Sequence, residues 1–270
     1  MRMATAVALA GAAVAAAAFS QAFVRLRRRG RTDLAGWDRA ALFGAGLVLG
    51  VLALSPPMDR AADRLLAAHM LEHLVIGDLV PALLLTAVRG PLLFFLLPPP
   101  LLRTLARLRA LRMLARTLLR PSVSFAVWAL SLAVWHVPAL YDRTLESAPL
   151  HALQHGSFVL GGMLVWAQLI DPAGRNALPQ RLRLGYALVL FVAGQALANT
   201  LILAYRPLYP AYAAQPHRLF GFSPLGDQDA AGLVMMGEQL ATLGTFAAIQ
   251  LRRWLRAPLV PQAARHPFAA

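Results

Sequence analysis

Five of the seven histidines stand at spacings suited to holding a metal ion. His69 and His73 are four residues apart, and so are His151 and His155. Residues four apart lie on one face of a helix, so each pair can present two imidazoles on the same side. Imidazole is a good ligand for copper, zinc and other late transition metals. Together with His136, the two pairs therefore predict a transition-metal site.

The composition places these histidines in a membrane protein. Hydrophobic residues make up 59% of the chain and charged residues only 14%, which is typical of integral membrane proteins. Cysteine is absent, so disulfides and thiolate ligands are excluded, and imidazole, thioether or oxygen must hold any metal. The net charge is +14, but the arginines lie between apolar segments rather than among exposed aromatics. They therefore indicate anionic lipids as partners, not nucleic acid.

Seven apolar segments are long enough to cross about 30 Å of hydrocarbon at about 1.5 Å per residue. They predict an all-α, polytopic membrane protein with one domain at residues 1–257 and a cytoplasmic tail at 258–270. Arginines follow the first segment, the reverse of the order in a cleavable signal, so we expect that segment to be retained. The predicted spans are residues 3–24, 38–55, 65–88, 121–141, 150–170, 184–205 and 229–251.

The arginines also predict how the spans are oriented. The connections after the first, third and fifth spans, together with the C-terminal tail, hold 20 arginines, whereas the N-terminus and the other connections hold 6. The positive-inside rule then puts the N-terminus outside and the C-terminus in the cytoplasm. In this topology the five histidines fall in one layer near the outer surface. Residues 101–119, which carry five arginines, are expected to form one amphipathic helix on the inner membrane surface.

Other polar side chains in or near the spans are candidates for accessory positions around the metal. Ionisable groups are costly in hydrocarbon and are usually functional, whereas amides often join helices and methionines often only pack. A single histidine in such a place is commonly satisfied by water or a backbone carbonyl, but repeated spacing at matched depth favours the metal site. The accessory candidates are Glu72, Asp227, Gln228, Met235 and Glu238.

Two further features have more than one interpretation. Asp78 lies about 140° round the helix from His73 and deeper, so we expect a buried glutamine or a cytoplasmic arginine as its partner. Residues 206–229 form the longest predicted outer connection and carry Tyr209 and Tyr212. This connection caps the site, docks a partner, or is an ordinary polar loop.

Several longer motifs accompany the histidines in a fixed order. They are HMLEH at 69–73, WHVPALYD at 135–142, HALQH at 151–155, PLYPAY at 207–212 and SPLGDQDAAG at 223–232.

These motifs resemble those of the caa3-type cytochrome c oxidase assembly factors, the CtaG family, over residues 47–251. Members are seven-helix bacterial membrane proteins implicated in copper supply to haem-copper oxidases. The resemblance implies copper at the five histidines, cytochrome c oxidase subunits as partners and a place in the bacterial plasma membrane. Spacing alone does not separate copper from zinc, and the resemblance favours copper. The predicted function is a non-enzymatic assembly factor that binds copper at the outer face and delivers it to the oxidase.

Other functions stay open beside this one. A copper transporter would need ligands at several depths, and below the outer third only Asp78, Glu238 and a few amides and methionines are found. A haem or quinone carrier would usually place single histidines opposite each other near mid-helix.

An intramembrane metalloprotease is a further alternative. His69, Glu72 and His73 match HxxEH, in which two histidines hold zinc and the glutamate acts as base. However, Gln154 stands at the corresponding position of the second histidine pair. This indicates that the metal pair is the shared element.

Overall fold

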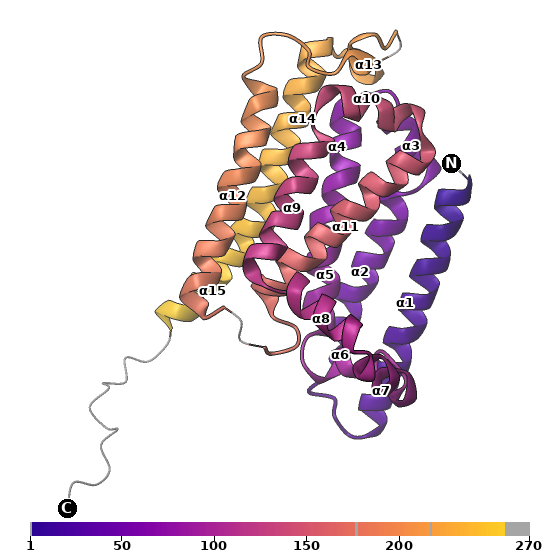
Figure 1. The fold of residues 1–270 in the computed structure, drawn as a ribbon, viewed down its shortest axis with the longest axis vertical. Coiled ribbons are helices and arrows are strands. Elements are labelled where there is room, and N and C mark those ends of the chain that lie inside the picture. Colours follow the sequence, from indigo (N-terminus) through magenta and orange to yellow (C-terminus); the bar gives the residue numbers. More distant parts are fainter. Residues whose placement is uncertain (1, 176–177, 217, 257–270) are drawn as a thin grey trace, which may run out of the picture.

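The computed structural model describes residues 2–175, 178–216 and 218–256, and within these ranges the chain is helical without a strand (Figure 1). The π-helical segments η1 (Val75–Leu79) and η3 (Leu240–Gly244) join α4 to α5 and α14 to α15, and a short turn, η2 (Leu219–Gly221), precedes α14. The helices are α1 (Arg2–Arg28), α2 (Trp37–Ala53), α3 (Pro56–Ala62), α4 (Leu66–Leu74), α5 (Val80–Val88), α6 (Pro91–Phe95), α7 (Pro99–Arg107), α8 (Arg109–Leu118), α9 (Pro121–Trp135), α10 (Pro138–Glu146), α11 (Ala148–Ile170), α12 (Gln180–Ile202), α13 (Pro210–Ala213), α14 (Pro224–Gln239) and α15 (Thr245–Leu255).

The long rods run between the two ends of the molecule: α1, α2, α4–η1–α5, α9, α11, α12 and α14–η3–α15 (Figure 1). Among the described residues, four helices are long and apolar enough to cross a membrane, or up to six if each of two bent helix pairs is one span. The bent pairs are α2 with α3, at 54°, and α8 with α9, at 74°. The all-helical membrane fold is thus confirmed, whereas the count of seven spans and the orientation stay predictions.

Two predicted helices have different bounds in the structure. The span predicted at 121–141 ends at Trp135, and a new helix begins at Pro138, because proline lacks the N–H that a continuing helix would need. The amphipathic helix predicted at 101–119 is divided into α7 and α8 at Leu108, whose backbone is extended. The tail predicted at 258–270 lies outside the described residues.

The predicted span 65–88 is one rod, but it contains a π-helical segment in its middle. Pro81 has no N–H to donate to the carbonyl of Gly77, four residues earlier, and η1 lies just before it. Helix α11 approaches closely at this point, since a Cβ atom on Gly162 would collide with the Gly77 carbonyl. This contact fixes α11 against α4–η1–α5, and these two rods carry both histidine pairs.

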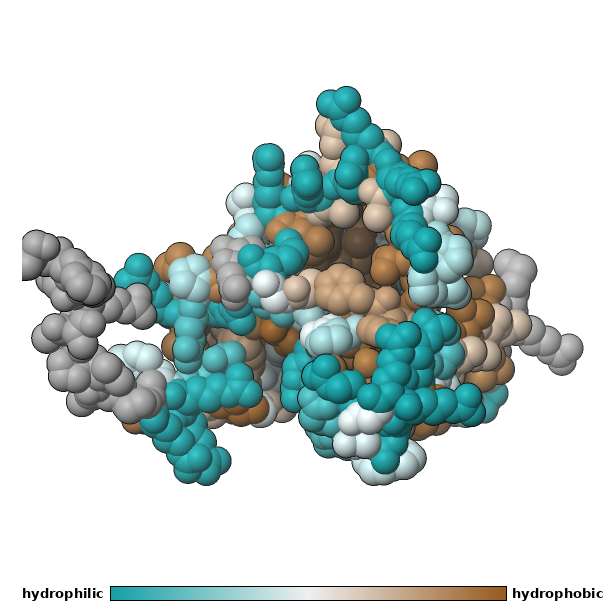
Figure 2. All heavy atoms as spheres, turned by 90° about the horizontal axis from the view of Figure 1, so that it is seen from below, coloured by the Kyte–Doolittle hydropathy of each residue, from teal (hydrophilic) through white to brown (hydrophobic). Residues whose placement is uncertain are grey.

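The end of the molecule that carries α6, α7 and α8 is rich in arginine. No residue of α7 or α8 is buried, and both helices expose arginine beside apolar side chains such as Leu101 and Leu114. Seen from this end, hydrophilic side chains surround an apolar hollow (Figure 2). The α10 and α13 helices and the N-terminus lie at the opposite end (Figure 1).

Candidate metal centre

Helices α4 and α11 bring four imidazoles together. One nitrogen atom from each of His69, His73, His151 and His155 lies within 4.8 Å of the other three, and we refer to these residues as the four-His centre. Ring centroids are 4.4 Å apart within the α4 pair and 4.2 Å apart within the α11 pair. Between helices, the rings of His73 and His155 are 5.0 Å apart. The i, i+4 spacing on two facing helices thus produces the convergence that the sequence predicts.

Several imidazole nitrogens of this centre have no hydrogen-bond partner in the described part of the chain and are therefore free to bind an ion. In the described residues, His73 Nδ1, His151 Nε2 and His155 Nε2 are buried without a hydrogen-bond partner. A buried polar atom without a partner is unfavourable, so these atoms need a ligand or water. Four neutral imidazoles satisfy a four-coordinate late transition metal. Because ligand nitrogens lie about 2 Å from such a metal, the rings would need to close in only slightly.

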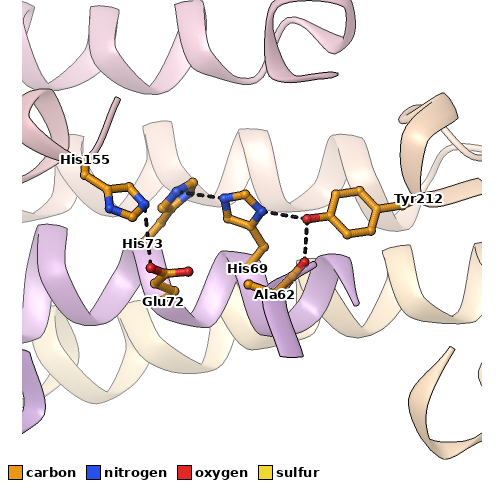
Figure 3. A network of polar contacts seen from close by, with 6 residues as sticks. All are labelled: Ala62, His69, Glu72, His73, His155 and Tyr212. Carbon is orange, nitrogen blue, oxygen red and sulfur yellow. Dashed lines mark hydrogen bonds and ion pairs between the residues drawn. The ribbon is translucent and has the colours of Figure 1, made fainter. Parts of the chain in front are cut away.

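Tyr212 orients the first histidine (Figure 3). Its hydroxyl donates to the carbonyl of Ala62 at 2.7 Å and also lies 2.6 Å from His69 Nδ1. Burial raises the pKa of the Tyr212 phenol well above its usual range, so the hydroxyl keeps its proton. Since that single proton goes to Ala62, the tyrosine oxygen must accept from Nδ1–H. His69 Nε2 is then left with its lone pair, 3.0 Å from His73 Nε2 and available to a metal.

Glu72 is the accessory candidate that touches the centre. Its side chain is 1% exposed, and its carboxylate lies 3.7 Å from His155 Nε2 (Figure 3). A carboxylate beside a ligating imidazole can orient it or balance the charge of an ion.

Asp227 and Gln228 lie at the start of α14 and position the centre from outside it. The Asp227 carboxylate accepts hydrogen bonds from the backbone N–H groups of Leu66 and Ala67, at 2.8 and 3.0 Å. These are the first residues of α4, which has no side-chain cap of its own. Gln228 accepts from the N–H of Leu208 and donates to the carbonyl of Leu201, so it ties α12 to the connection that carries Tyr212.

His136 lies near the four-His centre but is not one of its members. It follows the end of α9, and its Nδ1 bonds the carbonyl of Leu132 at 2.8 Å. That nitrogen must carry the proton because a carbonyl only accepts. His136 Nε2 is buried and has no partner among the described residues.

A cavity of 160 Å³, the outer cavity, leads to the centre from the α3 and α10 side. All members of the four-His centre except His73 line it, together with Glu72. Asp59 and Asp63 also line this cavity. Two carboxylates there favour the approach of a cation.

A second cavity, of 60 Å³, lies on the other side of His73, and we call it the inner cavity. His136 and the accessory candidates Met235 and Glu238 line it, as does Asp78. The histidines therefore lie between two cavities, the outer and the inner one. Met235 and Glu238 lie in the inner cavity, outside the four-His centre.

The predicted partner of Asp78 is wrong. Its carboxylate accepts hydrogen bonds from the indole N–H of Trp166 and, at 3.1 Å, from the hydroxyl of Thr242, rather than from a glutamine or an arginine. Trp166 was not a candidate because a tryptophan in a membrane span is usually interpreted as a residue that only packs against its neighbours. Asp59 and Asp63 were also missed, since short acidic segments between spans resemble ordinary loops. Tyr212 could be suspected only from its place in the longest outer connection.

The fold and the site define an all-helical protein with several candidate membrane spans and a group of four histidines that could hold a metal ion. The family model described as cytochrome c oxidase caa3 assembly factor (Caa3_CtaG) matches residues 17–257, and the chain belongs to this family. The resemblance seen in the motifs is thus confirmed. Comparison with curated proteins and with solved structures gives no match. Membership implies association with cytochrome c oxidase.

Proposed function

We propose that the four-His centre holds a copper ion in transit to cytochrome c oxidase. The observation that carries this proposal is the convergence of four imidazole nitrogens within 4.8 Å in a member of an oxidase assembly family. Copper(II) ranks highest among divalent first-row ions at nitrogen sites, and the chain offers no competing thiolate. The copper is cargo, and the role is not enzymatic.

The arginine distribution supports an outward-facing centre in the bacterial plasma membrane. The arginine-rich end with α7 and α8 would rest on anionic headgroups of the inner leaflet. The four-His centre lies towards the other end, below α3 and α10. An ion from the outer phase would then pass Asp59 and Asp63 before it meets the imidazoles.

Delivery requires ligands that can exchange. His151 and His155 line the outer cavity, and each has an unpartnered Nε2. His69, in contrast, is held by Tyr212. We infer that the α11 pair releases the ion first and that the α4 pair holds it. His136, as the fifth imidazole of the predicted layer, can accept the ion if it moves inward.

The copper transporter is the second candidate because of the inner cavity. It continues from His73 to Asp78 and Glu238, which gives polar groups at a second depth. The metalloprotease is less favoured, since Glu72 lies beside His155 of the other pair and Gln154 stands at the corresponding position of that pair.

The test is the copper content of the oxidase in cells that lack this protein and carry either the wild type or the His69→Ala/His73→Ala variant. We expect oxidase purified with the double variant to lose most of its copper relative to haem, because the α4 pair is gone. The exposed Tyr205→Ala serves as control and should keep full copper. Full copper in the oxidase with the double variant expressed at normal level would refute the proposal. Glu72→Gln should retain delivery, whereas a protease would lose its cleavage product.

A further inference from the structure

Two carboxyl groups line the inner cavity in the middle of the bundle, outside the four-His centre. Asp78 belongs to η1 and Glu238 to the last turn of α14, and both side chains line the inner cavity. Trp166 and Thr242 donate to the two oxygens of Asp78. Thr242 lies in η3, so both π-helical segments of this chain adjoin the pair. Such segments occur frequently at functional sites.

This pair has no compensating positive charge. None of the ion pairs formed by the described residues involves Asp78 or Glu238. Two neighbouring carboxyl groups in an apolar interior cannot both ionise without a large penalty, and even one buried negative charge without a cation beside it is unfavourable. While the centre is empty, the pair therefore holds two protons and is neutral, and after the loss of one proton the two groups share the other.

The inner cavity connects this pair with the metal centre. The titratable side chains that line it are the two carboxyls, His73 and His136, while α9, α11 and α12 contribute only uncharged groups from their described residues. His73 is 6% exposed, and its Nδ1 is one of the unpartnered nitrogens. Asp78 follows His73 by five residues, a rise of about 7.5 Å along the rod. In a low-dielectric interior, charges interact strongly over such a distance.

We propose that Asp78 and Glu238 form a proton-exchanging pair that releases one proton to water when a cation occupies the four-His centre. The bound cation adds one positive charge to the interior, and the released proton takes one away. The net charge of the buried groups therefore stays the same. The pair would then provide the negative charge that neutral imidazoles cannot. This inference depends on the proposed function, since it needs an ion at the centre.

The experiment measures bound copper and released protons in one titration. Purified protein in weak buffer at pH 7 receives Cu(I) without oxygen, as its acetonitrile complex, which carries no exchangeable proton. A pH indicator reports the protons, and metal analysis reports the copper. We expect about one proton per bound copper ion in the wild type. The double variant Asp78→Asn/Glu238→Gln has no proton to lose at this pair, so it should bind copper but release almost no protons.

Two further variants locate the source of the proton. Glu146→Gln, at an exposed carboxyl of α10, should release protons like the wild type. Glu72→Gln removes the carboxyl nearest the centre, and loss of the proton there with normal release in Asp78→Asn/Glu238→Gln would overturn the inference. Copper binding without proton release in the wild type would also overturn it, while the proposed function would stand. Failure of the wild type to bind copper would refute the proposed function instead.

Discussion

At the scale of residues, the four-His centre consists of four imidazole rings and the side chains that orient them. Tyr212 determines which nitrogen of His69 is free, and Asp227 holds the first turn of α4 from 160 residues further along the chain. Each of these contacts is buried, so each acts in a low dielectric where hydrogen bonds are strong. Positioning groups of this kind typically change metal affinity without touching the metal.

The variant Tyr212→Phe tests that role. Without the hydroxyl, His69 Nδ1 loses its acceptor, and the ring is free to adopt the tautomer that protonates Nε2. We expect copper to bind about 10- to 100-fold more weakly, as is typical when a partner of a ligating histidine is removed. Competition with a copper chelator measures the affinity. Tyr205→Phe, at a fully exposed tyrosine, should bind like the wild type. Equal affinities for the two variants would contradict the account.

At the scale of elements, the centre depends on how closely α11 approaches η1. The glycine at position 162 faces the Gly77 carbonyl and also Pro81, where a Cβ atom would come within 3.1 Å of the ring. The backbones therefore meet without side chains between them, as is common between membrane helices. Both α11 histidines lie on the same rod, towards its first residues, so a displacement here would carry them away from α4.

Gly162→Ala is the corresponding variant. The added methyl group must push α11 away from η1, and overpacking of this kind costs about 1–3 kcal/mol. We expect a lower unfolding temperature in detergent and copper affinity reduced by about tenfold or more, since 1.4 kcal/mol corresponds to a factor of ten. Gly156→Ala is the matched control on the same helix, because a Cβ atom there meets nothing within 4 Å. A normal unfolding temperature and normal copper binding in Gly162→Ala would show that this contact does not position the centre.

At the scale of the whole molecule, the arginine-rich surface and the four-His centre lie towards opposite ends of the bundle. Arginines gather around α6 to α8, and the outer cavity and the four-His centre lie towards α3, α10 and α13 (Figure 1, Figure 2). The polar groups between them, Asp78 and Glu238, lie below the histidines at the inner cavity. The molecule thus combines an arginine-rich surface suited to anionic lipids with the four-His centre towards the other end of the bundle.

Most of the features that could be predicted follow from the pattern of residues within single segments of the sequence. The long rods follow from apolar length, and the two histidine pairs follow from the i, i+4 spacing, which survives any small error in helix bounds. His136 was grouped with the others by depth alone. In the structure it lies just past the end of α9 and outside the four-His centre, and its place among the ligands stays a prediction.

Contacts between distant segments could not be predicted in the same way. Asp227 caps α4, and Trp166 donates to Asp78, because the packing of whole helices brings them together. Nothing in the spacing of single segments encodes such pairs. The break at Leu108 in the amphipathic region is likewise without a sequence signal, since neither glycine nor proline stands there.

The most direct test of the central claim is copper binding by purified protein in which one histidine pair at a time is replaced. If α4 and α11 share one ion, the wild type binds one copper ion tightly, and both His69→Ala/His73→Ala and His151→Ala/His155→Ala lose it. His136→Ala should keep tight binding, because that ring lies outside the four-His centre. Tight binding of a full equivalent of copper by either double variant would contradict the account.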